Sequence, residues 1–273
     1  MNPIDAVFER LRSGRRKAFI PFVTAGDPDL TVTDQLAREL VSCGASLVEL
    51  GFPYSDPIAD GSVIQASYTR ALNNGVRIDD VFACARGLST APLLVERAVP
   101  LVAMVSFSLV YRRGPEKFLD KARASGLSGA IVPDLPVEES EALSRLAAAR
   151  DFKLIQLVTP TTPRERAVRI AHTSTGFLYC VSVTGITGER DRLPDSLLGQ
   201  LAWLRQQTNL PLCVGFGISK PEHVRMLRDV ADGVIVGSAL VKKLEKAGSA
   251  PRTQIVQEIG ALAQSLADTL NPK

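Results

Sequence analysis

Short apolar runs alternate along the chain with longer segments whose apolar residues recur at helical spacing. The runs are continuous rather than alternating, which is typical of parallel strands that are buried on both faces. The pattern predicts eight strands, at residues 18–24, 47–51, 101–107, 130–133, 154–158, 177–183, 212–216 and 234–236. Helices are predicted between them, at residues 31–43, 115–125, 137–149, 163–171, 195–206 and 221–229.

The regular alternation of strand and helix indicates a parallel sheet with right-handed crossovers. Eight such units in a chain of 273 residues favour an α/β fold of the (β/α)₈ TIM-barrel class. The alternative is an open, doubly wound sheet. No G-x-G-x-x-G motif follows the first predicted strand, where the chain instead reads Thr24-Ala-Gly-Asp-Pro28.

Four further helical segments belong to this predicted barrel. Two helical patterns, at residues 62–72 and 79–87, separate the second and third predicted strands, which predicts an extra helix after the second strand. An N-terminal helix at residues 3–11 is expected to cover the bottom of the barrel, and residues 252–270 form the last outer helix. No low-complexity linker interrupts the chain, so residues 1–273 are expected to form one domain.

Composition and charge exclude several classes of partner. The chain is 45% hydrophobic and 22% charged, which is ordinary for a globular protein. A net charge of +3 is too small to indicate a nucleic-acid partner, and the basic cluster at residues 12–17 has no interleaved aromatic residues. We interpret that cluster as a solvated connection between a helix and a strand.

Neither a membrane nor a metal is expected. No apolar run approaches the roughly 20 residues that span a bilayer, and the N-terminus carries acids early, so we expect a cytoplasmic protein. The four cysteines form no C-x-x-C pair and lie in apolar surroundings, as in a reducing compartment. Neither His172 nor His223 has metal-ligand spacing to another residue.

Two carboxylates mark the candidate chemistry. Glu49 lies inside an apolar run that is predicted to be a buried strand, and Asp60 closes the Pro-rich loop that follows. Burying a lone charge is costly, so Glu49 is expected to face a cavity in which two acids perform general acid/base chemistry. The alternative is structural: Glu49 pairs with an Arg inside the barrel, and Asp60 caps the next helix.

Turns rich in small residues follow the last three predicted strands, at residues 184–190, 215–219 and 237–239. Glycine lets backbone N–H groups approach an anion closely, and a helix N-terminus adds a favourable dipole. Together the turns predict a phosphate site held mainly by backbone amides, although tight strand-to-helix turns would also explain the glycines. Several apolar residues near strand ends would suit a flat apolar ring, or simply pack the core: Phe22, Ile64, Leu127, Phe216 and Ile235.

Taken together, these motifs resemble one known family. The segments at residues 49–61, 134–140, 185–188, 215–219 and 237–239 resemble those of tryptophan synthase α subunits, and the similarity runs over nearly the whole chain. The resemblance implies a (β/α)₈ barrel that cleaves indole-3-glycerol phosphate to indole and glyceraldehyde 3-phosphate, with no metal or organic cofactor. It also implies a pyridoxal-phosphate-dependent β subunit that receives the indole in an αββα heterotetramer.

The resemblance also assigns roles to individual residues. Glu49 would shuttle protons, and Asp60 would stay ionised and accept a hydrogen bond from the indole N–H. The Asp56–Pro57 loop would contact the β subunit. The substrate would be bound by the following residues: Phe22, Tyr179, Thr187, Gly188, Phe216, Gly217, Gly237 and Ser238.

The chain departs from the family pattern at three positions. Ser62 stands where many members have Pro, and Ser106 and Ser108 stand where a Tyr and an Asn are frequent. These changes affect the expected pocket wall and the coupling to the partner. Three alternative functions remain open at this point: a standalone lyase that releases free indole, a catalytically silent activating partner, and another sugar-phosphate barrel such as an isomerase.

Overall fold

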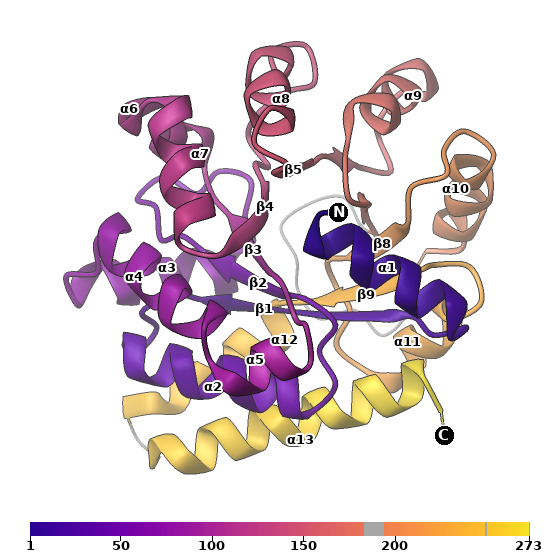
Figure 1. Ribbon diagram of the computed structural model, residues 1–273. Helices are drawn as coiled ribbons and strands as arrows, with labels where there is room; N and C mark the ends of the chain where they lie inside the picture. Colours follow the sequence, from indigo (N-terminus) through magenta and orange to yellow (C-terminus); the bar gives the residue numbers. More distant parts are fainter. Residues whose placement is uncertain (183–193, 249, 273) are drawn as a thin grey trace.

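The core of the molecule is a parallel sheet that wraps once around an axis (Figure 1). The computed structural model describes residues 1–182, 194–248 and 250–272. In this part of the chain the strand order is β5-β4-β3-β2-β1-β9-β8-β7-β6, and each paired neighbour is parallel. The strands are β1 (Ala18–Thr24), β2 (Val48–Gly51), β3 (Leu101–Met104), β4 (Leu127–Ile131), β5 (Lys153–Ile155), β6 (Leu157–Val158), β7 (Leu178–Val181), β8 (Leu212–Gly215) and β9 (Gly233–Val236).

The two ends of this sheet meet at Gln156. Gln156 separates β5 from β6. The two strands at the ends of the sheet therefore follow each other directly in the chain, and together they correspond to the fifth predicted strand. Its backbone N–H donates to Ser174 Oγ at 3.0 Å, and its carbonyl accepts from the Tyr179 N–H at 3.1 Å. The predicted (β/α)₈ barrel is therefore confirmed, and the open, doubly wound alternative is wrong.

Helices surround the barrel on the outside. The predicted pair after the second strand is present as α3 and α4. The helices of the described residues are α1 (Pro3–Ser13), α2 (Leu30–Ser42), α3 (Ser62–Asn73), α4 (Ile78–Ser89), α5 (Pro92–Glu96), α6 (Phe107–Arg113), α7 (Pro115–Ala124), α8 (Glu141–Ala148), α9 (Arg164–Thr173), α10 (Asp195–Arg205), α11 (Pro221–Leu227), α12 (Ser238–Val241) and α13 (Arg252–Leu270), with the 3₁₀ turn η1 (Lys242–Gly248).

The third predicted strand is too long at its end. Residues 101–107 were expected to be extended, but β3 stops at Met104 and α6 begins at Phe107. Ser106 caps this helix by accepting from the Ser108 N–H at 3.2 Å. Asp134 fixes the same turn, because its carboxylate accepts from Ser106 Oγ at 2.6 Å and from the Phe107 N–H at 2.8 Å. A distant carboxylate therefore decides where this strand ends.

Strand periodicity divides the apolar residues into two layers. In β1, Ile20 and Phe22 belong to the cluster inside the barrel, whereas Phe19 and Val23 pack outward against the helices. Successive side chains of a strand point to opposite faces, so a continuous apolar run serves both layers. This explains why the strands carry few polar residues.

The N-terminal helix closes one end of the barrel, as expected from the sequence. Figure 1 shows α1 lying across the front of the strands. Phe8 packs on Phe177 with ring centroids 5.7 Å apart. Asn2 Nδ2 donates to the carbonyls of Ser128 at 3.0 Å and Asp151 at 2.7 Å, at the start of the fourth and fifth strands. The opposite end of the barrel, at the strand C-termini, is not covered by α1 and is the end where active sites of this fold lie.

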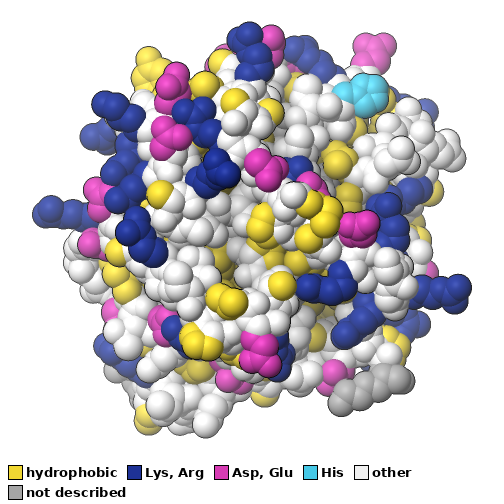
Figure 2. All heavy atoms as spheres, in the orientation of Figure 1, with side chains coloured by type: hydrophobic (Ala, Val, Ile, Leu, Met, Phe, Trp, Pro, Cys, Tyr) yellow, Lys and Arg dark blue, Asp and Glu magenta, His cyan; other side chains and the backbone are white. Residues whose placement is uncertain are grey.

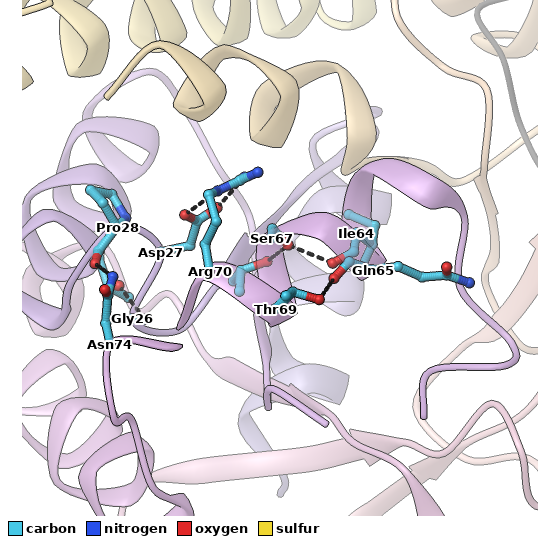
Figure 3. Close-up of polar contacts among 11 residues, drawn as sticks. Gly26, Asp27, Pro28, Ile64, Gln65, Ser67, Thr69, Arg70 and Asn74 are labelled. Atoms are coloured by element: carbon cyan, nitrogen blue, oxygen red, sulfur yellow. Dashed lines mark hydrogen bonds and ion pairs between the residues drawn. The ribbon is translucent and has the colours of Figure 1, made fainter. Parts of the chain in front are cut away.

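A polar ladder ties α3 to the end of β1 (Figure 3). Thr24 and Ser67 share a hydrogen bond of 2.7 Å between their hydroxyls. One turn later, the Arg70 guanidinium donates two bonds to the Asp27 carboxylate, at 2.9 and 2.7 Å. The Asp27 side chain is fully buried, while Arg70 is 31% exposed. These contacts fix the helix that follows Asp60 relative to the strands.

Replacing Arg70 by Met should destabilise the fold strongly, because the buried Asp27 carboxylate would lose its partner. Removing one member of a buried pair costs about 3 to 5 kcal/mol in free energy of unfolding. The control is Arg38→Met, which breaks the more exposed pair with Asp34 and should cost about 1 kcal/mol or less. Urea denaturation of both variants gives the comparison, and equal losses would contradict the assigned role of Asp27.

Candidate active site

A cavity of about 250 Å³ opens at the C-terminal ends of the strands. Both candidate carboxylates, Glu49 and Asp60, line it. Its full lining is Phe22, Glu49, Asp60, Gly61, Ser62, Val63, Ile64, Met104, Tyr179, Phe216, Gly217, Ile218, Ser219, Ile235, Gly237, Ser238, Ala239 and Lys242. The tertiary structure thus gathers residues from both halves of the sequence at the end of the barrel where active sites of this fold lie.

Glu49 is a buried acid without a charged partner. It lies in β2 opposite Phe22 of β1, is 1% exposed, and its Oε1 has no hydrogen-bond partner among the described residues. Desolvation raises the pKa of Glu49 to about 8, because burial disfavours the charged form. The structural alternative, a pair with an internal Arg, is wrong for the described part of the chain.

Asp60 lies on the turn that leads into α3. Its N–H donates to the Pro57 carbonyl at 3.1 Å, and Gln65 Nε2 donates to the Asp60 carbonyl at 2.8 Å. The residue that caps α3 is Gly61, and no side chain closes that helix end, so the capping alternative is also wrong. Burial, and then the charge of Asp134, raise the pKa of Asp60 to about 6.

The two carboxylates therefore differ in proton affinity. At pH 7, Glu49 is mostly protonated because its pKa is about 8. Asp60 is mostly ionised because its pKa is about 6. A neutral acid can donate a proton, and an ionised one can accept a hydrogen bond or stabilise developing positive charge. Two acids whose environments separate their pKa values are the usual basis of acid/base roles.

Aromatic and aliphatic side chains form the walls between the carboxylates and the cavity mouth. The rings of Tyr179 and Phe216 meet edge to face, with centroids 6.0 Å apart. Two strand glycines make room for such rings. A Cβ at Gly51 would collide with the Phe22 ring, and one at Gly215 would collide with Tyr179.

The apolar ring expected from the sequence is only partly correct. Phe22, Ile64, Phe216 and Ile235 do line the cavity. Leu127, in contrast, is the first residue of β4 and packs in the outer core. Leu127 therefore lies at the N-terminal end of β4, away from the cavity at the strand C-termini, and the predicted fourth strand began three residues too late.

The far end of the cavity is formed by the turns after β8 and β9. Gly217, Gly237 and Ser238 line it, as expected. The backbone is left-handed at both Phe216 (φ 68°) and Gly217 (φ 71°), which is unusual for a phenylalanine. The Phe216 carbonyl accepts a hydrogen bond from Ser182 Oγ, which helps to hold this turn. Thr187 and Gly188, which were also expected here, lie outside the described residues.

The expected partner loop is exposed beside the cavity. Asp56 is exposed and accepts from Ser55 Oγ at 2.8 Å, while Pro57 is half-buried. The next residue, Ile58, is 86% exposed.

Several site residues were missed in the sequence. Lys242 lines the cavity one helical turn after Ser238, a spacing that could have been noticed, and it supplies a cation near the glycine turns. Ser219 Oγ is buried there and has no hydrogen-bond partner among the described residues. Tyr68 lies in the inner cluster, and burial, then Asp60 and Glu49, raise its pKa well above the usual value. Only folding of α3 onto the barrel reveals that Tyr68 is near both acids.

No metal site accompanies these groups in the part of the chain that the structure describes, where no three potential ligands of the His, Cys, Asp or Glu type gather. Among the same residues, no helix is long and apolar enough to cross a membrane. The described site is therefore built from carboxylates, aromatic rings and backbone turns.

A (β/α)₈ barrel with a buried and a half-buried carboxylate of separated pKa facing one apolar cavity has the features of an enzyme of the TIM-barrel class. The model of the tryptophan synthase alpha chain family matches residues 8–271. The chain belongs to this family. It is 49% identical to the tryptophan synthase alpha chain of Rhodopirellula baltica over 99% of both chains, and 48% identical to that of Synechocystis over 89% of this chain and 91% of the relative.

Solved structures agree with this assignment. Subunit alpha of tryptophan synthase from Legionella pneumophila superposes with a TM-score of 0.88 at 34% identity, over 100% of both chains. A chain from the tryptophan synthase a2b2 complex of Pyrococcus furiosus gives a TM-score of 0.82 at 37% identity, covering 92% of this chain and 98% of that one. The fold of this chain therefore has solved structural counterparts over nearly its whole length.

Glu49→Gln should stabilise the protein at high pH. The Glu49 carboxyl has a pKa of 4.5 in the unfolded chain and of about 8 in the folded protein. At pH values between these two, the native state retains a proton that the unfolded state has lost. Stability therefore falls with rising pH, by at most about 1.4 kcal/mol per pH unit from this group. The amide of the Glu49→Gln variant does not titrate, so the stability of the variant does not fall with pH at this position. Denaturation at pH 5, 7 and 9 should show a gap between variant and wild type that widens with pH; a constant gap would contradict the raised pKa.

Proposed function

We propose that this chain cleaves indole-3-glycerol phosphate to indole and glyceraldehyde 3-phosphate, as a carbon–carbon lyase. The proposal is carried by Glu49, an unpaired buried acid whose pKa of about 8 keeps it protonated at neutral pH. Membership of the tryptophan synthase alpha chain family supports the same reaction. An apolar cavity with a cationic, glycine-lined end fits a substrate with an indole ring and a phosphate.

The reaction needs one proton delivered and one removed. Glu49 donates a proton to indole C3, which makes the ring a leaving group. The bond between C3 and the glycerol chain then breaks, its electrons return to the ring, and the adjacent hydroxyl gives up its proton to Glu49 as the aldehyde forms. Asp60 stays ionised and accepts a hydrogen bond from the ring N–H while positive charge develops there. The enzyme ends in its starting protonation state.

The remaining cavity residues bind and orient the substrate in this proposal. Phe22, Tyr179 and Phe216 flank the indole ring. Gly217, Gly237 and Ser238 hold the phosphate through backbone N–H groups, with Lys242 as the nearby cation. The family resemblance adds Gly188 to the phosphate site, and it gives Thr187 the separate role of helping to orient Asp60.

A β subunit is the proposed partner. The related Pyrococcus chain comes from an a2b2 complex, and the loop of Asp56, Pro57 and Ile58 lines a smaller cavity that shares Asp60 and Met104 with the candidate active site. The indole would pass to pyridoxal phosphate bound by that partner, with no cofactor in this chain.

We further propose that the chain forms one domain and acts in the cytoplasm. The alternative, a standalone lyase, is favoured only by the departures at Ser106 and Ser108.

Indole release from indole-3-glycerol phosphate by the purified chain, with and without a β subunit, tests this function. Slow release alone and a large increase with partner are expected, with none from Glu49→Gln. The amide cannot donate or accept the proton, yet it keeps the shape of the side chain. Fast release alone would identify a standalone lyase. Near-normal turnover by a folded Glu49→Gln protein would contradict the proton-shuttle role.

The pH dependence gives a separate test of the two roles. We expect kcat/KM to rise as Asp60 ionises near pH 6 and to fall as Glu49 loses its proton near pH 8, which gives a bell-shaped profile. Replacing Asp134 by Asn removes a charge that raises the pKa of Asp60, so the rising limb should move to lower pH while the falling limb stays. A rising limb that does not move would contradict the assignment to Asp60.

A further inference from the structure

A second cavity lies at the opposite end of the barrel from the candidate active site, where α1 ends and β1 begins. It has a volume of about 280 Å³. Its lining is Phe8, Leu11, Arg12, Arg15, Arg16, Lys17, Pro211 and Asp232. Four of these eight side chains are cationic, and they come from the basic cluster that sequence alone suggested to be a solvated connection. Figure 2 shows Lys and Arg side chains gathered over the end of α1.

Three of these cations have no partner within the part of the chain that the structure describes. Among the described residues, the guanidinium groups of Arg12, Arg15 and Arg16 form no hydrogen bond or ion pair, and all three side chains are exposed. Other arginines, such as Arg70 and Arg150, pair with carboxylates. Like charges at one cavity repel each other, so an arrangement that keeps three of them unpaired favours an anionic ligand.

The backbone that presents the cations is held firmly. At the end of α1, the Arg15 N–H donates to Arg12 O at 3.1 Å and the Arg16 N–H to Leu11 O at 2.8 Å. Asn271 brackets Lys17 with bonds of 2.8 and 2.9 Å to its N–H and carbonyl. Lys17 Nζ also donates to the Ala231 carbonyl at 2.7 Å. The backbone is therefore already ordered, and a bound ligand would restrict only the side chains.

The only carboxylate in the lining is already compensated. Asp232 accepts hydrogen bonds from Arg205 and, at 2.8 Å, from the Leu212 N–H. The C-terminal end of α1 carries a partial negative charge from the helix dipole, and the four cationic side chains of the lining exceed it. Phe8, at 6% exposed, forms an apolar wall that limits water on one side and strengthens charge interactions.

We propose that this cavity binds a diphosphate group. Guanidinium forks match phosphate oxygens in two-point contacts, and three of them with one ammonium exceed what a single phosphate or carboxylate can satisfy. The diphosphate can be free pyrophosphate or part of a nucleoside diphosphate, and both present the same linked pair of phosphates. The site is independent of the proposed lyase reaction.

The test is calorimetric titration of the whole chain with pyrophosphate at low ionic strength, with glycerol 3-phosphate present to occupy the proposed substrate phosphate site. One binding site is expected. Arg15→Gln and Arg16→Gln should each weaken it about tenfold, as expected for one charge-assisted contact. The matched control is Arg10→Gln, which removes the same charge from an exposed residue of α1 that does not line the cavity, and it should change the affinity less than twofold.

The outcomes separate the possibilities. Binding of both pyrophosphate and ADP, lost in the Arg15 and Arg16 variants, establishes the diphosphate group as the unit recognised, and binding of pyrophosphate alone restricts the site to the free ion. Absence of pyrophosphate binding, or an equal loss with Arg10→Gln, would overturn the proposal. The unfolding temperature confirms that each variant is folded. Indole release without pyrophosphate should be unchanged in these variants, so failure of one proposal leaves the other standing.

Discussion

The burial of one carboxylate is the constraint on which the rest of the site depends. Glu49 occupies a strand position that an apolar residue would fill at lower free energy, and none of the described residues compensates its charge. The group responds by holding its proton, which is a property useful for acid catalysis but unfavourable for stability at high pH. The surrounding apolar wall, and the glycines that admit its aromatic rings, preserve that environment.

Asp60 has a different character because a different structure holds it. It lies on a turn rather than in a strand, is partly exposed, and is influenced by Asp134 from a neighbouring loop. The position of this turn depends on α3, which the buried pair of Arg70 and Asp27 anchors to the end of β1 (Figure 3). An ion pair outside the cavity thus helps to fix the position of Asp60 relative to Glu49, and with it their electrostatic interaction.

The two ends of the barrel serve different purposes. The C-terminal end carries the cavity and the exposed loop at Asp56, and α1 closes the N-terminal end. The departures from the family pattern also acquire a structural meaning: Ser106 caps α6 and, through Asp134, joins this helix to the surroundings of Asp60. A change at α6 can therefore reach the carboxylate electrostatically, without any movement of the strand that bears Glu49.

Sequence alone predicted the barrel, the pair of helices after the second strand and the two carboxylates that line the cavity, because strand and helix periods and a charge within an apolar run are local properties of the chain. It could not determine where β3 ends, since the Asp134 carboxylate that caps α6 is 28 residues from Ser106. Nor could it identify Tyr68 or the cavity around Arg15 and Arg16, or show that Leu127 faces away from the site. Those features depend on which side chains packing brings together, and only the tertiary structure decides burial, field and pKa.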